Sequence, residues 1–108
     1  MGNRVTVVAA EDAPLIATDL VQVLETSDVP GGVVNVLTGS HSELAPHIGG
    51  HADIDAVWSF SSSDLARTLE YEAAINLKRT WIAEPQPSSE AFLTAATEIK
   101  TVWVPYGE

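Results

Sequence analysis

Cysteine is absent from all 108 residues of the chain. Without a thiol, these residues cannot form a disulfide, a zinc–thiolate site or a cysteine nucleophile. The absence leaves the cellular compartment undetermined, because a chain without thiols is compatible with reducing and oxidising surroundings alike.

Basic residues are scarce as well. Five Lys and Arg residues stand against fifteen Asp and Glu, which gives a formal net charge of −10. A surface with this excess of negative charge repels both the phosphate backbone of nucleic acid and anionic lipid headgroups. We therefore expect neither nucleic acid nor membrane as a partner.

Long apolar runs are also missing. The run Val5-Thr6-Val7-Val8 near the N-terminus is too short for the apolar part of a signal peptide or for a membrane span. We accordingly expect a cytoplasmic protein. Hydrophobic residues nonetheless make up 45% of the chain, which suits a single globular domain of modest core size.

Strand-like and helix-like segments alternate along the sequence. Short apolar segments rich in β-branched or aromatic residues predict strands at residues 5–9, 33–37, 56–60, 79–83 and 100–104. Such alternation is typical of a parallel sheet with right-handed crossovers. The predicted fold class is α/β, a three-layer Rossmann-like parallel sheet of about five strands with helices on both faces.

Helical signals fill the intervals between these strands. Pro14 suits a first helical position, and a core-facing stripe is predicted at Ile16, Leu20, Val23 and Leu24. A capping box at Ser40–Glu43 predicts a second helix that ends at Gly49-Gly50. A third helix follows Ser61–Ser63, with an apolar stripe at Leu65, Leu69, Ala73 and Leu77. A short fourth helix is expected at residues 90–97.

Several short motifs occur in the order and spacing of a known family. They are Gly2-Asn3, Glu11, Ala13-Pro14-Leu15, Pro30–Gly39, His51, Asp53-Ile54-Asp55 and Asn76-Leu77-Lys78-Arg79. Together they resemble the cofactor domain of the aldehyde dehydrogenase superfamily over about three quarters of the chain. The resemblance implies an oxidoreductase fold built to hold NAD or NADP, in enzymes that work through a cysteine thiolate.

Departures from the family pattern fall on the positions that contact the cofactor. The family's Lys-Pro-Ser-Glu, whose Lys bonds the adenosine ribose, is here Val8-Ala9-Ala10-Glu11. Val8 has no side-chain donor. The later glycines of the Thr-Gly-x-Gly segment are replaced by His41 and Ala45. An imidazole at that position would crowd the approach of a cofactor to the backbone.

The third cofactor segment is altered in a similar way. Ser62 matches the family's helix-capping serine, but the two glycines around it have become Ser61 and Ala66. Asp64 adds a negative charge near the start of the helix, where it would compete with a phosphate. By family position, the candidate cofactor-binding residues are Glu11, Gly39 and Ser62, each of which also has a structural interpretation as a turn or capping residue.

After Arg79 the family motifs stop, and the final stretch from Ala96 to Val104 resembles the family's C-terminal tail. We therefore divide the chain into a degenerate cofactor domain at residues 1–83 and a linker, short helix and tail strand at 84–108. In relatives this tail belongs to the oligomerisation element. The expected partners are another copy of the chain or an aldehyde dehydrogenase domain, bound through the tail strand.

No other catalytic or metal site is indicated. His41, His47 and His51 do not share one helical face, so no metal is expected. Ser61–Ser63 lack the Gly-x-Ser-x-Gly elbow of a serine nucleophile, and Asp53 and Asp55 are interpreted as turn residues. Catalytic residues are therefore predicted to be absent. The three tryptophans are expected to pack on strands, at Trp58, Trp81 and Trp103.

Three functions remain open. The first is a non-catalytic, aldehyde-dehydrogenase-like domain with a structural or oligomerisation role and no cofactor. The second is an NAD(P)-binding fragment of a dehydrogenase whose catalytic domain lies elsewhere, supported by Glu11 and Ser62. The third is an unrelated doubly wound module such as a receiver or flavodoxin-like domain. A receiver needs an acidic cluster at the strand ends and a Lys late in the chain, and Glu11, Asp12 and Lys100 match this pattern only in part.

Overall fold

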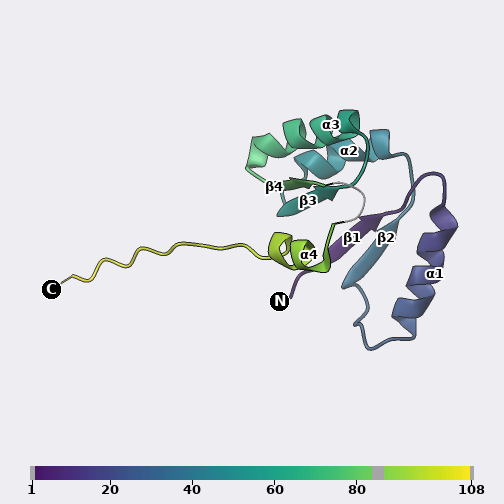
Figure 1. Ribbon diagram of the computed structural model, residues 1–108, viewed down its shortest axis with the longest axis horizontal. Helices are drawn as coiled ribbons and strands as arrows, with labels where there is room; N and C mark the ends of the chain where they lie inside the picture. The colour runs from purple at the N-terminus through teal and green to yellow at the C-terminus, as the bar shows by residue number, and fades with distance from the viewer. Residues whose placement is uncertain (1, 84–86, 108) are drawn as a thin grey trace.

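Strands and helices alternate up to residue 95 in the computed structural model, which describes residues 2–83 and 87–107 (Figure 1). The strands are β1 (Val5–Val8), β2 (Val34–Leu37), β3 (Ala56–Ser59) and β4 (Arg79–Ile82). The helices are α1 (Pro14–Glu25), α2 (His41–Gly50), α3 (Ser63–Ala73) and α4 (Ser89–Ala95), with a 3-10 turn η1 at Ala74–Asn76. The predicted α/β class and the order of these elements are confirmed.

The strands form two separate parallel pairs in place of the predicted sheet of about five strands. β1 pairs with β2 from Val5↔Val34 to Val8↔Leu37. β3 pairs with β4 from Ala56↔Arg79 to Ser59↔Ile82. Within the described residues no ladder joins the two pairs. The composition of a strand predicts that it will pair but leaves open which edge it pairs with.

Helices cover both faces of the β3–β4 pair. On one face Val57 packs with Ala45 of α2 and Leu69 of α3 in the buried core. On the other face Trp58 and Trp81 contact Phe92 of α4, with ring centroids 5.7 and 5.4 Å apart. Figure 1 shows this arrangement, with α2 and α3 on one side of the strands and α4 on the other. Successive residues of a strand point to opposite faces, so Val57 packs against α2 and α3 while Trp58 packs against α4.

The predicted core-facing stripe of α1 is wrong at three of its four positions. Ile16, Leu20 and Val23 are exposed by 70, 44 and 62%. The half-buried residues of α1 are instead Ala17, Val21 and Leu24. The apolar arc of α1 is wider than one stripe, and only the half that faces the strands is covered.

The predicted stripe of α3 also extends too far. Leu69 and Ala73 are buried as expected, but Leu77 is 91% exposed. The helix ends at Ala73, and Leu77 has a φ of 54°, in the left-handed region. A left-handed residue turns the chain out of a helix, and here it directs the backbone toward β4.

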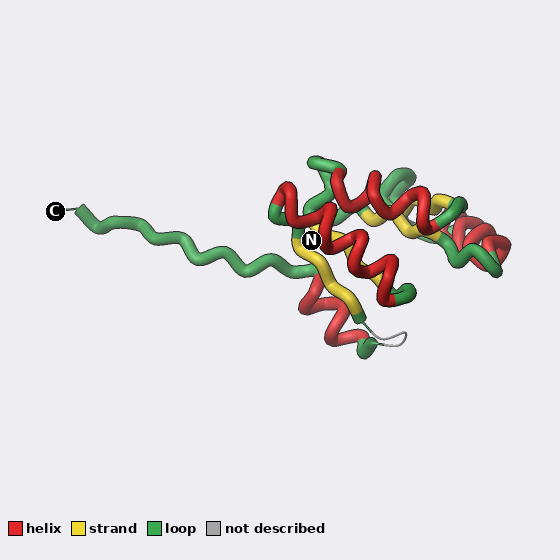
Figure 2. The backbone as a smooth tube through the Cα atoms, turned by 90° about the horizontal axis from the view of Figure 1, so that it is seen from above, coloured by secondary structure: helices red, strands yellow, loops and turns green. Residues whose placement is uncertain are grey.

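The predicted fifth strand, at residues 100–104, is not formed. This segment has no regular secondary structure and extends away from the body of the molecule (Figure 2). Trp103, expected to pack on a strand, is 90% exposed. A strand needs a neighbour for its N–H and C=O groups, and no described strand lies beside this one. The predicted linker begins at residues 84–86, which lie outside the described residues.

Lys78 holds the turn that leads into β3. Its buried Nζ donates to the carbonyl oxygen of Ile54 at 2.7 Å and to that of His51. Asn76 also donates to the His51 oxygen, at 3.3 Å. Burial lowers the pKa of Lys78, while the nearby carboxylate of Asp55 acts in the opposite direction.

We expect Lys78→Met to lower the free energy of unfolding by about 1–2 kcal/mol, because the Ile54 carbonyl loses its donor. Since the folded-state pKa lies below the ordinary value of 10.5, the unfolded chain binds more protons between the two values. The stability of the wild type relative to Lys78→Met should therefore rise as pH approaches 10.5 from below. Urea denaturation of both proteins from pH 7 upward measures this, with the exposed Lys100→Met as control. A difference that shrinks with rising pH would contradict the assignment.

Candidate functional site

The segments that follow β1 and β2 meet at the carboxyl ends of these paired strands. Oε1 of Glu11, which follows β1, accepts a hydrogen bond from the backbone N–H of His41, the first residue of α2. The His41 ring returns the contact, with Nε2 2.7 Å from the carbonyl oxygen of Ala9. Since a carbonyl only accepts, Nε2 is the protonated nitrogen. Glu11 and His41 therefore fasten the β1–α1 loop to the start of α2.

This contact gives Glu11 the capping role that the sequence assigned to Ser40. Ser40 does occupy the N-cap position of α2, but its side chain makes no bond to a helix amide. Its Oγ lies 2.9 Å from Oγ of Ser42 instead. The pairing of β1 with β2 brings Glu11 to His41, thirty residues later in the chain. The partial positive charge at the helix N-terminus then stabilises the carboxylate.

Gly39 connects β2 to α2 beside the same contact. A Cβ atom added at Gly39 would lie 3.3 Å from Cδ1 of Leu44. The missing side chain thus lets α2 pack closely over the end of β2. Gly39 therefore has a packing role against Leu44, beside the turn role that the sequence predicted.

Ser62 lies at the end of β3, in the other strand pair. It occupies the N-cap position of α3, yet its hydroxyl makes no capping bond. The neighbouring Ser61 is engaged with Ser59, with their Oγ atoms 2.6 Å apart. Asp64 sits in the first turn of α3 and forms an exposed ion pair with Arg67 at 3.6 Å. Among the described residues, no hydrogen bond links Ser62 to Glu11 or Gly39.

Three features of the arrangement bear on the binding of a dinucleotide. At the N-terminus of α2, where backbone N–H groups can bind an anion, the N–H of His41 is already bonded to the Glu11 carboxylate. The first turn of α3 carries the negative charge of Asp64. Val8, at the family position of the ribose-binding Lys, offers no side-chain donor. Each of the two helix N-termini thus has a carboxylate beside it.

The ring of His51 bonds the backbone of its own turn. His51 Nδ1 accepts from the N–H of Asp53 at 3.2 Å, which fits the structural role expected for the Asp-x-Asp turn. Over residues 2–83 and 87–107, no group of three or more His, Asp and Glu side chains is arranged to hold a metal ion. In the same residues, no helix has the length and apolar character needed to cross a membrane.

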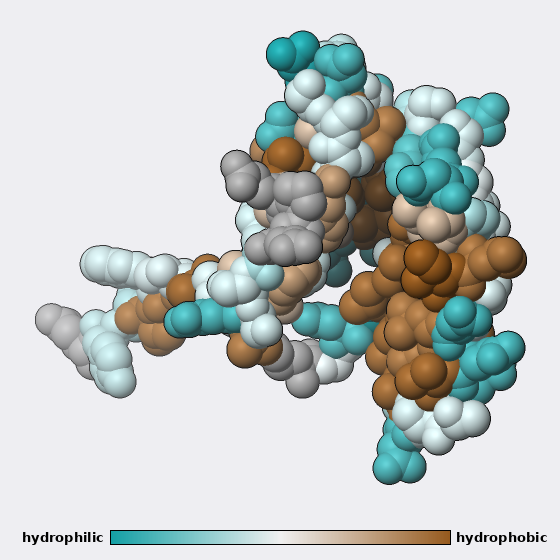
Figure 3. All heavy atoms as spheres, turned by 45° about the vertical axis from the view of Figure 1, so that its right-hand side comes forward, coloured by the Kyte–Doolittle hydropathy of each residue, from teal (hydrophilic) through white to brown (hydrophobic). Residues whose placement is uncertain are grey.

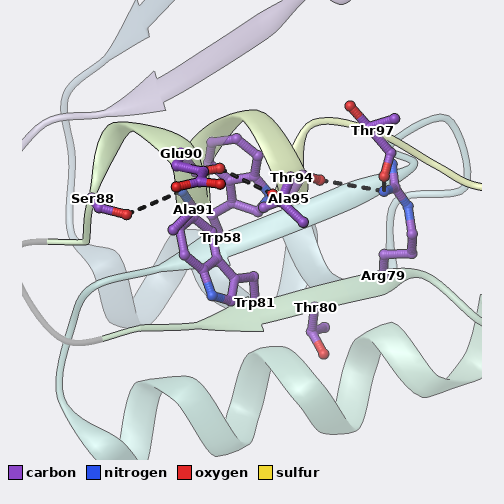
Figure 4. Close-up of a pocket in the computed structure, with 10 residues that line it drawn as sticks. All are labelled: Trp58, Arg79, Thr80, Trp81, Ser88, Glu90, Ala91, Thr94, Ala95 and Thr97. Atoms are coloured by element: carbon purple, nitrogen blue, oxygen red, sulfur yellow. Dashed lines mark hydrogen bonds between the residues drawn. The ribbon is translucent and has the colours of Figure 1, made fainter.

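A groove of about 720 Å³ lies between α4 and the β3–β4 pair. Figure 4 shows Trp58 and Trp81 under α4, and Arg79 at the end where α4 finishes. Nη1 of Arg79 donates to the carbonyl oxygens of Ala95 and Thr97, both at 3.3 Å. This guanidinium therefore caps the C-terminus of α4, a role that the sequence did not reveal.

Sequence reasoning missed the structural role of His41. We expected its imidazole to obstruct a cofactor, while the structure places it in a direct contact with the segment after β1. Two features of the sequence could have indicated this contact. One is a polar residue, His41, at a predicted helix start, and the other is an acidic residue, Glu11, after a predicted strand. These features become specific only once β1 and β2 are known to be neighbours.

Comparison with known proteins identifies the family. A model of the aldehyde dehydrogenase family matches residues 1–97. Cytosolic aldehyde dehydrogenase 1 of Rattus norvegicus is 42% identical over 80 residues, which cover 72% of this chain and 16% of the relative. The NADP/NAD-dependent aldehyde dehydrogenase PuuC of Escherichia coli K12 is 34% identical over 82 residues, covering 75% of this chain and 17% of the relative.

A solved structure agrees in fold. An aldehyde dehydrogenase from Bartonella henselae superposes with a TM-score of 0.71 and 22% identity, over 75% of this chain and 17% of that one. The chain therefore spans about a sixth of the length of the relatives that it matches. On the extent of the family match and the shared fold, the chain belongs to the aldehyde dehydrogenase family.

Proposed function

We propose that this chain is a non-catalytic aldehyde-dehydrogenase-like module with a structural role, which associates with another chain through its C-terminal tail. The observation that carries the proposal is the Glu11–His41 contact. It ties the segment after β1 to the first residue of α2 through the Glu11 carboxylate and the His41 ring. A fold of the family is thereby kept while its cofactor junction is closed.

The composition supports the same proposal. Family members work through a cysteine thiolate, and these 108 residues contain no cysteine. Association through the tail is supported by its exposure, since Ile99, Val102 and Trp103 are at least 77% exposed. Exposed apolar groups that gather on one segment favour contact with a partner. Another copy of this chain, or a domain of the same family, is the proposed partner.

A second candidate function is an NAD(P)-binding part of a dehydrogenase whose catalytic residues lie elsewhere. It is favoured by the retention of Glu11 and Ser62 at family positions and by the α/β fold. PuuC, one of the relatives, is itself described as NADP/NAD-dependent. The two functions differ in whether the wild-type chain binds the cofactor.

Calorimetric titration of NAD and NADP distinguishes them. We expect no saturable heat with the wild type at millimolar cofactor. The double variant Val8→Lys/His41→Gly should gain measurable binding, because it restores a ribose donor and removes the imidazole that contacts the Ala9 carbonyl. Val8→Met/His41→Gly is the matched control without a donor. Saturable binding to the wild type that weakens in Glu11→Ala would establish the second function instead.

A further inference from the structure

The groove between α4 and the β3–β4 pair takes no part in the proposed function. Small side chains of α4, Ala91 and Ala95, line one side of it, and the half-buried Trp58 and Trp81 line the other. Its volume of about 720 Å³ lies in the range of small-molecule pockets, roughly 300–1,000 Å³. As in those pockets, apolar and aromatic groups are combined with few charged ones.

Arg79 is the lining residue with unused hydrogen-bonding capacity. Its Nη1 donates to the carbonyl oxygens of Ala95 and Thr97, and a guanidinium has three further N–H groups, on Nε and Nη2. Within the described residues these three groups have no acceptor, and the ion pairs found there involve Arg67 and Lys100 instead. A half-buried guanidinium thus faces the groove without a counter-ion, although acidic residues outnumber basic ones fifteen to five.

The two charged side chains of the groove lie toward opposite ends of α4. Glu90 is in the first turn, while Arg79 bonds to Ala95, five residues later and about 7–8 Å along the helix axis. Figure 4 shows Trp58 and Trp81 under α4, with Arg79 at the end where α4 finishes. An anion bonded to Arg79 can therefore extend an apolar body toward the indoles. A second negative charge at the far end would be repelled by Glu90.

We propose that this groove binds a small aromatic monocarboxylate. The carboxylate accepts paired N–H bonds from Nε and Nη2 of Arg79. The ring packs against the indoles of Trp58 and Trp81, because aromatic rings associate edge to face with a gain beyond the burial of their area. A single negative charge also suits a chain of net charge −10, which repels polyanions. Neither Glu11 nor His41 lines the groove, so the proposal goes beyond the proposed function and does not depend on it.

The apolar surface around α1 lacks such a cation. Figure 3 shows hydrophobic atoms gathered over the side of the molecule where α1 lies. This helix carries Asp19 and Glu25 and no basic residue. An uncharged aromatic molecule can bind at either surface, whereas an anionic one is favoured only beside Arg79. Comparing an anionic probe with its neutral analogue therefore separates the groove from general apolar binding.

NMR titration of the full-length wild type at pH 7 makes this comparison on the indole N–H signals. The probes are phenylacetate, whose carboxyl group is ionised at this pH, and the uncharged phenylacetamide. We expect saturable shifts at Trp58 and Trp81 with phenylacetate, with a dissociation constant of about 1 mM. Phenylacetamide should bind at least about tenfold more weakly. Trp103 is the internal control, because it is 90% exposed and does not line the groove.

Variants of Arg79 give the second readout. Arg79→Gln should weaken phenylacetate binding at least about tenfold and leave the affinity for phenylacetamide unchanged, a difference that a purely structural role would not produce. Arg79→Lys keeps the charge and should recover part of the affinity. Arg67→Gln, at an exposed position on α3, is the matched control and should bind as the wild type does. Where Arg79→Gln also frees α4, both probes lose affinity together, and the wild-type comparison of the two probes decides.

Three outcomes would overturn the proposal. They are equal affinity of the wild type for the two probes, shifts at Trp103 that match those at Trp58 and Trp81, and the lack of any saturable shift at tens of millimolar phenylacetate. None of them bears on cofactor binding, which the NAD titration decides separately.

Discussion

Gly49→Leu is expected to lower the free energy of unfolding by about 3 kcal/mol, because overpacking between closely packed helices forces backbone shifts. Gly49 is buried on α2, where α2 packs against α3. A Cβ atom at this position would lie 2.6 Å from Cβ of Glu72 and 3.3 Å from the carbonyl oxygen of Leu69. Both atoms are tied to the α3 backbone and cannot swing aside, so the two helices must separate. Urea denaturation followed by circular dichroism measures the loss.

The next residue supplies a matched control. A Cβ at Gly50 would meet only Oε2 of Glu72, at 3.8 Å, the mobile end of a side chain. Gly50→Leu should therefore change stability by less than about 0.5 kcal/mol, as for an ordinary surface substitution. Equal losses in the two variants would show that the effect comes from the helix position and not from the α2–α3 contact.

Trp81→Ala is expected to cost about 3 kcal/mol, at the low end for a large aromatic residue because Trp81 is only half-buried. Its ring lies 5.2 Å from that of Trp58, 5.7 Å from Phe60 and 5.4 Å from Phe92, all near perpendicular. Phe92 is the residue through which α4 joins this cluster. A helix of seven residues is unstable in isolation, so removing Trp81 should also release α4 from the sheet.

Amide hydrogen exchange measures the release of α4. Protection at Ala95 and Ala96 should fall in Trp81→Ala, while that of α2 and α3 should change far less. Tyr71→Ala is the matched control, because this aromatic residue of α3 is 75% exposed, and it should leave both stability and the exchange of α4 unchanged. Retention of α4 protection in Trp81→Ala would contradict the role assigned to the aromatic cluster.

Local signals in the sequence were sufficient for most elements. Pro14 begins α1, and the apolar segments of β1 to β4 were located to within one residue at each end. Their residues carry the signal themselves, through fixed φ at Pro and β-branched side chains. For the tail, the same local signals gave a wrong prediction. Its composition is that of a strand, yet pairing requires a neighbour, and neighbours are set by tertiary structure.

The candidate site was predictable in its order but not in its contacts. Glu11, Gly39 and Ser62 do follow β1, β2 and β3 in turn. Which of them meet depends on strand pairing: β1 pairs with β2, so Glu11 reaches His41, while Ser62 follows a strand of the other pair. Likewise the helical period identified the apolar positions of α1, but not which half of that arc is covered.

The NMR titration of the ¹⁵N-labelled wild type with NAD tests the central claim, a family fold whose cofactor junction is closed, most directly. Because the N–H of His41 at the start of α2 is already bonded to Glu11, the amide signals of Glu11, Gly39, His41 and Ser62 should stay in place up to millimolar NAD. Saturable shifts that are confined to these amides would contradict the claim and identify the chain as a cofactor-binding part of a dehydrogenase.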